Sequence, residues 1–209
     1  MSDWSSAKNN PDLPDDIYQE IRRFYKSKIK LPAEKPDRQF MLCPVGTVGA
    51  GKTTVVKPLS EKLNLVRIST DELREIMKNR GFNYERVRDI SFEILKEFIE
   101  GGYSVVLDGN CGTPGGINKI KWLEENYQIK SVWILINPPE EFIINKLKNY
   151  KHTWLFRDGE EAVNSYFEYK KKYGDPTNLN LPYIYTFDTS KPDINNQIEE
   201  AAEIIKKSL

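Results

Sequence analysis

The sequence predicts an α/β domain built on a five-stranded parallel sheet with helices on both faces. Five short apolar runs recur along the chain, and each has the length of a buried strand. Helix-like stretches separate these runs, and this alternation is typical of a parallel sheet covered on both sides. The apolar runs span residues 40–45, 65–68, 103–107, 132–136 and 183–187.

The stretches between the apolar runs carry apolar residues at helical spacing and polar residues elsewhere. We expect helices near 52–63, 71–100, 117–126, 139–149 and 159–173, with a last one near 193–207.

Residues 1–38 are expected to form a tail and an amphipathic helix ahead of the main domain, which spans 39–209. Residues 1–14 are polar and predict a loose tail. Asp15 and Asp16 then suit the positive end of a helix. The apolar stripe of this helix consists of Ile17, Ile21, Phe24, Tyr25 and Ile29.

Composition excludes several classes of protein. The 31 Lys and Arg residues balance 31 Asp and Glu residues, so no strong overall charge draws the chain to nucleic acid or membrane. A local basic patch is compatible with this balance. The two cysteines form no CxxC pair, and no apolar run approaches the roughly 20 residues that cross a bilayer. We therefore expect a cytoplasmic protein without a disulfide framework.

The first apolar run leads directly into GTVGAGKT, Gly46 to Thr53, which fits the Walker A pattern at every fixed position. We call residues 46–53 the phosphate loop. Its glycines let successive backbone N–H groups point at phosphate oxygens, and the following helix presents its positive end. The motif predicts binding of ATP, with Lys52 beside the β- and γ-phosphates and Thr53 as a ligand of Mg²⁺. The predicted nucleotide contacts are Gly46, Thr47, Val48, Gly49, Ala50, Gly51, Lys52, Thr53 and Thr54.

The second apolar run ends in Ser-Thr-Asp-Glu-Leu-Arg, which allows two interpretations. In one, Ser69 and Glu72 form a capping box and Asp71 pairs with Arg74 at a helix start. In the other, Asp71 faces the crevice at the carboxyl edge of the sheet and accepts the proton of an attacking hydroxyl. Arg74 would then hold an anionic group of the substrate.

The third apolar run ends in Leu-Asp-Gly-Asn. Asp108 is either part of a simple Asp-Gly turn or an acid that holds the Mg²⁺ shell or orients the substrate, as a Walker B acid does. The apolar residues before it favour a central strand next to the phosphate loop. Asn110 follows in the same loop and is a candidate substrate contact.

The order of these motifs resembles the P-loop kinases of the polynucleotide kinase and zeta-toxin-like group, over about residues 40–190. The resemblance implies the P-loop NTPase fold with strand order 2-3-1-4-5. It also implies that Asp71 is the general base, that Arg74 binds a substrate phosphate, and that Asp108 contacts the substrate.

Members of that group carry an arginine-rich lid over the phosphates. Here Lys146 and Lys148 stand where arginines are usual, and Arg157 is the one arginine between residues 145 and 173. Lysine cannot make the bidentate fork of arginine. Arg157 is therefore interpreted in two ways, as the lid cation that helps cover the γ-phosphate or as a solvated surface charge paired with Asp158. With His152 expected to face solvent and no Cys/His cluster nearby, no zinc site is predicted.

The predicted activity is transfer of the γ-phosphate of ATP to a hydroxyl group. One candidate acceptor is the 5′-hydroxyl of a nucleic acid, which the basic residues at 22–30 and 146–151 would guide to Arg74. A small-molecule acceptor, such as a nucleoside, a sugar nucleotide or an antibiotic, is the alternative. A third interpretation is a nucleotide-binding regulatory module with weak ATPase activity.

Overall fold

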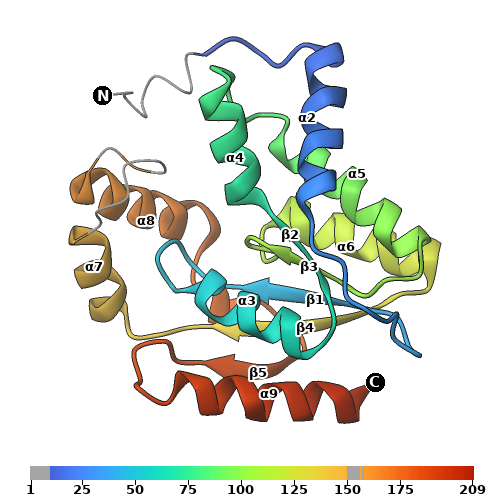
Figure 1. The fold of residues 1–209 in the computed structure, drawn as a ribbon. Helices are drawn as coiled ribbons and strands as arrows, with labels where there is room; N and C mark the ends of the chain where they lie inside the picture. The colour runs from blue at the N-terminus through green and yellow to red at the C-terminus, as the bar shows by residue number, and fades with distance from the viewer. Residues whose placement is uncertain (1–9, 150–155, 157) are drawn as a thin grey trace.

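The computed structural model describes residues 10–149, 156 and 158–209, which fold around one parallel five-stranded sheet (Figure 1). The strand order is β2-β3-β1-β4-β5, which confirms the predicted fold class and order. The strands are β1 (Phe40–Val45), β2 (Val66–Ser69), β3 (Val105–Asp108), β4 (Lys130–Ile136) and β5 (Tyr183–Phe187). The helices are α2 (Asp15–Lys28), α3 (Lys52–Lys62), α4 (Thr70–Asn79), α5 (Val87–Glu100), α6 (Pro114–Tyr127), α7 (Glu140–Lys148), α8 (Gly159–Tyr173), the 3₁₀ turn η1 (Pro176–Asn178) and α9 (Ile194–Ser208).

The central strand β1 divides two cores. It pairs with β3 on one side and β4 on the other, and every one of its residues is buried. Because side chains alternate along a strand, Met41 and Cys43 enter one core while Phe40 and Leu42 enter the other. This double burial explains why the run reads as continuously apolar rather than alternating.

Helices cover both faces of the sheet (Figure 1). Helices α2, α4, α5 and α6 pack into the core that contains Met41, whereas α3, α7, α8 and α9 pack into the core that contains Phe40. The phosphate loop lies between these layers at the carboxyl end of β1. In the described ranges, no helix has both the length and the apolar character needed to cross a membrane.

The helix expected over 71–100 is two helices. Helix α4 ends at Asn79 and α5 begins at Val87. Gly81 adopts a left-handed φ of 77°, which ends the first helix, and the buried Asn83 amide donates to Asp12 Oδ1 at 2.6 Å. The break lets the chain turn while tying it to the segment before α2.

The N-terminal helix α2 packs against α4 and α5. Its buried residues are Tyr18, Ile21 and Tyr25. Phe24, expected on the apolar stripe, is 37% exposed and its ring lies beneath Arg80. The predicted helix is therefore present, but its buried face is rotated toward Tyr18.

Candidate functional site

The phosphate loop joins β1 to α3 and depends on glycine at three positions. Gly49 and Gly51 have left-handed φ values of 78° and 90°. A Cβ atom on Gly46 would lie 2.7 Å from the carbonyl oxygen of Ile136, which is too close for any side chain. Gly46 is therefore required by close packing, while Gly49 and Gly51 are required by their backbone conformation.

Lys52 is the first residue of α3, and its ammonium group lies over the phosphate loop. It donates to the carbonyl oxygens of Gly46 and Thr47 at 3.2 and 2.8 Å. Burial lowers the pKa of Lys52, while the nearby carboxylates of Asp71 and Asp108 act in the opposite direction. The placement brings one cation and two acids around the loop.

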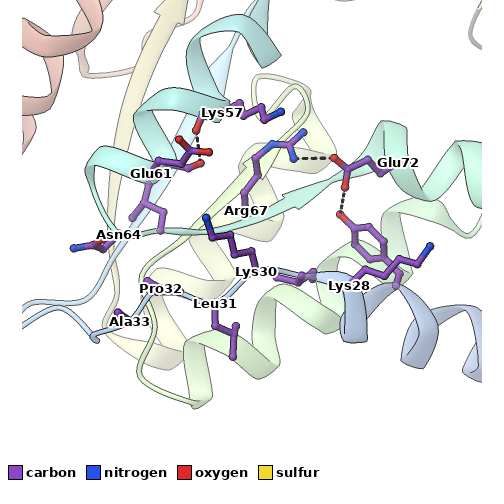
Figure 2. A pocket seen from close by; sticks show the side chains of 14 residues that line it. Lys28, Lys30, Leu31, Pro32, Ala33, Lys57, Glu61, Asn64, Arg67 and Glu72 are labelled. Atoms are coloured by element: carbon purple, nitrogen blue, oxygen red, sulfur yellow. Dashed lines mark hydrogen bonds and ion pairs between the residues drawn. The ribbon is translucent and has the colours of Figure 1, made fainter.

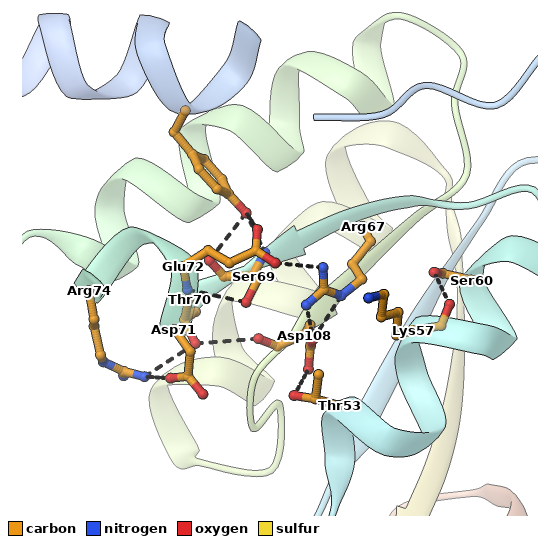
Figure 3. A network of polar contacts seen from close by, with 11 residues as sticks. Thr53, Lys57, Ser60, Arg67, Ser69, Thr70, Asp71, Glu72, Arg74 and Asp108 are labelled. Atoms are coloured by element: carbon orange, nitrogen blue, oxygen red, sulfur yellow. Dashed lines mark hydrogen bonds and ion pairs between the residues drawn. The ribbon is translucent and has the colours of Figure 1, made fainter. Parts of the chain in front are cut away.

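Thr53 and Asp108 meet at the ends of α3 and β3 (Figure 3). The Thr53 hydroxyl donates to Asp108 Oδ1 at 3.1 Å, and Asp108 is only 3% exposed. Burial raises the pKa of Asp108, and the guanidinium of Arg67, which lies 2.8 Å away through Nε, opposes this increase. The structure therefore brings together the two side chains predicted to hold a metal ion.

Asp71 and Arg74 lie one turn apart at the start of α4 (Figure 3). The Ser69 hydroxyl caps this helix by accepting from the Glu72 N–H at 3.4 Å, which is one half of the predicted capping box. The other half is replaced, because the Ser69 N–H donates to the Tyr25 hydroxyl and not to Glu72. Arg74 Nη1 lies 2.5 Å from Asp71 Oδ1 and 3.3 Å from the Thr70 hydroxyl. The Asp71–Arg74 pair also lines the cavity next to the phosphate loop. Its position is therefore compatible both with a role at the helix start and with a role in catalysis.

A cavity of about 960 Å³ connects the predicted site residues. Its wall contains Lys52 and Thr53 of α3, Asp71 and Arg74 of α4, and Asp108 and Asn110 at the end of β3, which are three separate segments. The carboxyl ends of parallel strands meet at one edge of a sheet, which explains why these segments converge.

Asn110 has a role that the sequence did not suggest. Its side-chain oxygen accepts from the N–H groups of Gly46 and Gly112 at 3.4 and 3.1 Å. Its side-chain nitrogen donates to the Tyr169 hydroxyl. Asn110 thus links the phosphate loop to the segment that follows β3 and to α8.

Several further side chains on the cavity wall were not predicted. Arg88 and Lys119 add positive charge, while Phe92, Tyr169 and Tyr173 add aromatic surface. They come from α5, α6 and α8, and no short motif marks them. Helical periodicity could have indicated which face of each of these helices is turned toward the protein interior. It could not have indicated that these faces line one shared cavity.

The predicted lid lies only partly in the described ranges. Arg157 and His152 lie outside the described residues. Lys146 at the end of α7 lines the cavity, where desolvation lowers its pKa. Lys148 is exposed.

The donor atoms at Thr53 and Asp108 fit Mg²⁺. No cluster of three or more His, Cys, Asp and Glu side chains occurs in the part of the chain that the structure describes. Mg²⁺ accepts such a sparse set, because it is typically held by one or two protein oxygens together with substrate phosphates and water. The residues present therefore suit Mg²⁺ bound with a nucleotide.

A second cleft, of about 560 Å³, lies between α3 and the segment that follows α2 (Figure 2). Lys30 and Lys57 lie on its wall, and Arg67 and Glu72 form its inner end. Arg67 is therefore reached from this cleft on one side and contacts Asp108 on the other.

Comparison with known proteins places the chain among kinases. The AAA_33 family, described as an AAA domain, matches residues 41–164, more than half of the chain. A shikimate kinase of Azobacteroides pseudotrichonymphae genomovar. CFP2 is 39% identical over 79 residues, covering 34% of this chain and 45% of that protein. The chain thus spans less than half the length of this relative. A shikimate kinase of Persephonella marina is 24% identical over 137 residues, covering 61% of this chain and 79% of that protein.

Among solved structures, the APS kinase CysC of Mycobacterium tuberculosis, in complex with AMPPNP and APS, superposes with a TM-score of 0.53. It is 15% identical and covers 82% of this chain and 99% of that chain. At this identity the likeness shows the fold alone. The family match, together with the complete Walker A motif on the observed sheet, confirms the predicted class of enzyme. The chain belongs to the AAA_33 family and is a P-loop kinase, an ATP-dependent phosphotransferase.

Proposed function

We propose that this kinase phosphorylates a hydroxyl group of a small anionic molecule, with shikimate as the first acceptor to test. The observation that supports this most is the shared cavity: the Thr53–Asp108 pair and the Asp71–Arg74 pair face the same 960 Å³ space beside the phosphate loop. A volume of this size suits a nucleotide and a small acceptor.

Each residue then has a defined role. The N–H groups of the phosphate loop and Lys52 bind the β- and γ-phosphates, and Arg74 binds the anionic group of the acceptor. Thr53 and Asp108 would hold Mg²⁺, which neutralises charge on the phosphate oxygens. Arg157 is the proposed lid cation, and its side chain lies outside the described residues. The remaining phosphate-loop residues contact the nucleotide through the backbone, with Thr54 at the start of α3.

The transfer step is proposed to run through Asp71. The acceptor oxygen forms a bond to the γ-phosphorus as the bond between that phosphorus and the β–γ bridging oxygen breaks, and ADP leaves. The acceptor proton moves to the Asp71 carboxylate. Arg74, paired with Asp71 at 2.5 Å, keeps this carboxylate oriented before the acceptor binds.

The choice of a small anionic acceptor has two supports. Arg74, Arg88 and Lys119 lie on the cavity wall; Arg74 pairs with Asp71 and Lys119 with Asp89, and a carboxylate or phosphate on the acceptor would share these cations. The curated relatives that the chain matches are named shikimate kinases, and shikimate carries both a carboxylate and hydroxyl groups.

A nucleic acid acceptor has less support. Two cations of the basic stretch expected to guide it are paired in helix packing: Arg22 with Glu93 and Glu97 of α5, and Lys26 with Glu97. These ion pairs neutralise the face that would approach a polynucleotide. None of the compared kinases is named for a nucleic acid acceptor.

The test is an acceptor screen that follows ADP release with MgATP. Shikimate, other hydroxy acids, adenosine phosphosulfate, sugar nucleotides and 5′-hydroxyl oligonucleotides are offered at equal concentration. We expect transfer to a small carboxylate- or phosphate-bearing alcohol and none to oligonucleotides. Transfer to oligonucleotides that declines steeply with salt would refute the proposed acceptor class. Slow ATP hydrolysis with no acceptor would instead favour the regulatory module.

A further inference from the structure

The carboxylate of Asp108 has a different partner for each oxygen. Oδ1 accepts from the Thr53 hydroxyl at 3.1 Å, while Oδ2 accepts from Arg67, with Nε at 2.8 Å and Nη2 at 2.6 Å. The contact crosses from β2 to β3, which are parallel neighbours. Arg67 therefore leaves one Asp108 oxygen directed at the predicted metal position.

This contact matters because Asp108 is almost fully buried, at 3% exposure. A buried carboxylate that lacks partners rotates or takes up a proton, since desolvation disfavours its charge. Two nitrogens of the planar guanidinium, Nε and Nη2, converge on Oδ2 and hold this oxygen in place, whereas a lysine ammonium would make a single contact there. Arginine at position 67 thus holds the Asp108 carboxylate in its observed orientation.

Arg67 is itself held from the N-terminal helix. Its Nη1 lies 2.8 Å from Glu72 Oε1. The Tyr25 hydroxyl of α2 has one proton to donate, and it lies 3.2 Å from the Ser69 carbonyl oxygen and 3.4 Å from Glu72 Oε2. The buried Tyr25 hydroxyl also accepts from the Ser69 N–H at 2.6 Å, at the end of β2. Helix α2 precedes the segment matched by the family, which begins at residue 41.

We infer that Arg67 is a positioning residue that orients Asp108 for Mg²⁺, and that Tyr25 extends this support to helix α2. The inference rests on the proposed role of Asp108 as a metal ligand. Arg67 is not on the wall of the 960 Å³ cavity, and its proposed role is exerted through Asp108. Helix α2 is then part of the catalytic unit and not only a cover for α4 and α5.

The expected effect is on metal affinity. Partners that orient a metal ligand typically contribute about 10- to 100-fold in metal affinity. Arg67→Lys keeps the positive charge but loses the second bond to Oδ2, so we expect a loss in that range. Tyr25→Phe removes one hydroxyl at the outer end of the network, so we expect a smaller loss in the same direction.

The experiment measures free Mn²⁺ by electron paramagnetic resonance as Mn²⁺ is titrated into enzyme saturated with AMPPNP. AMPPNP binding without metal is measured beside it, and is expected to stay unchanged in both variants. Arg22→Lys and Tyr18→Phe are the matched controls, because both residues lie on α2, and Arg22 pairs with α5 without contacting Asp108. Neither control is expected to change Mn²⁺ affinity.

Asp108→Asn tests the metal site itself, separately from the positioning role of Arg67. If Asp108→Asn weakens Mn²⁺ binding and Arg67→Lys does not, the positioning role is wrong and the proposed function stands. If Asp108→Asn binds Mn²⁺ as the wild type does, the proposed metal site itself is wrong. Should Arg67→Lys fail to fold, unchanged Mn²⁺ affinity in Tyr25→Phe overturns the inference, and a loss that Tyr18→Phe does not share supports it.

Discussion

Replacement of Asp71 by asparagine is the most direct test of the proposed chemistry. The amide has nearly the same size as the carboxylate and can still contact Arg74 through its oxygen. It cannot accept the acceptor proton as a base. The cap of α4 is preserved, because the Ser69 hydroxyl, and not Asp71, accepts from the Glu72 N–H.

The structure sets the size of two separate effects. A positioned general base contributes about 10²- to 10⁴-fold, so kcat is expected to fall by that factor while ATP affinity stays nearly constant. The Asp71–Arg74 ion pair is partly exposed, at 38% and 28%, and such pairs contribute about 0–1 kcal/mol to stability. For a chain of this length 1 kcal/mol corresponds to about 2–4 °C, so Tm should fall by less than about 4 °C.

Steady-state kinetics with the acceptor from the screen and thermal unfolding check these two effects. Asp89→Asn is the matched control, since Asp89 also lines the cavity but pairs with Lys119 at 3.2 Å. Near-normal kcat together with a clearly lower Tm in Asp71→Asn would refute the reasoning. Asp71 would then serve only as a helix-start residue, and Asp108 would be the next acid to test as the base.

Three other substitutions test separate parts of the site. Lys52→Ala should abolish phosphate transfer and weaken ATP binding without unfolding the domain; turnover equal to wild type would remove the phosphate-loop assignment. Gly49→Ala forces a side chain into a left-handed φ of 78° with its Cβ 2.9 Å from Leu147, so we expect weaker ATP binding and, from a cost of about 1–2 kcal/mol, a Tm lower by about 2–8 °C. Gly115→Ala in α6, whose Cβ would meet no atom within 4 Å, should leave Tm equal to or slightly above that of the wild type. Arg157→Ala should lower kcat by about 10³-fold or less, near the low end known for such arginines, with little change in ATP binding; a change within about twofold would assign the lid to the lysines.

Local patterns in the sequence were sufficient for the strands, most helices and the phosphate loop. The run at 40–45 is β1 without any shift, and the helix at 159–173 is α8. These elements follow from short-range chemistry: apolar runs demand burial on both faces, and the loop glycines permit left-handed backbone. The Ser69 cap belongs to the same class, because its donor lies three residues away.

Tertiary structure decided the partners of Asp108 and the course of the chain around 80–86. Arg67 and Asp108 are 41 residues apart, and Tyr25 and Ser69 are 44 apart. No spacing rule connects residues so distant; they meet because β2 lies beside β3 and α2 packs against α4. The division between α4 and α5 likewise depends on Asn83 reaching Asp12 across the fold. The sequence by itself determined which residues could take part in the chemistry. The order of strands in the sheet determined which of these residues contact one another, because side-chain contacts across a sheet depend on which strands are neighbours and not on distance along the chain.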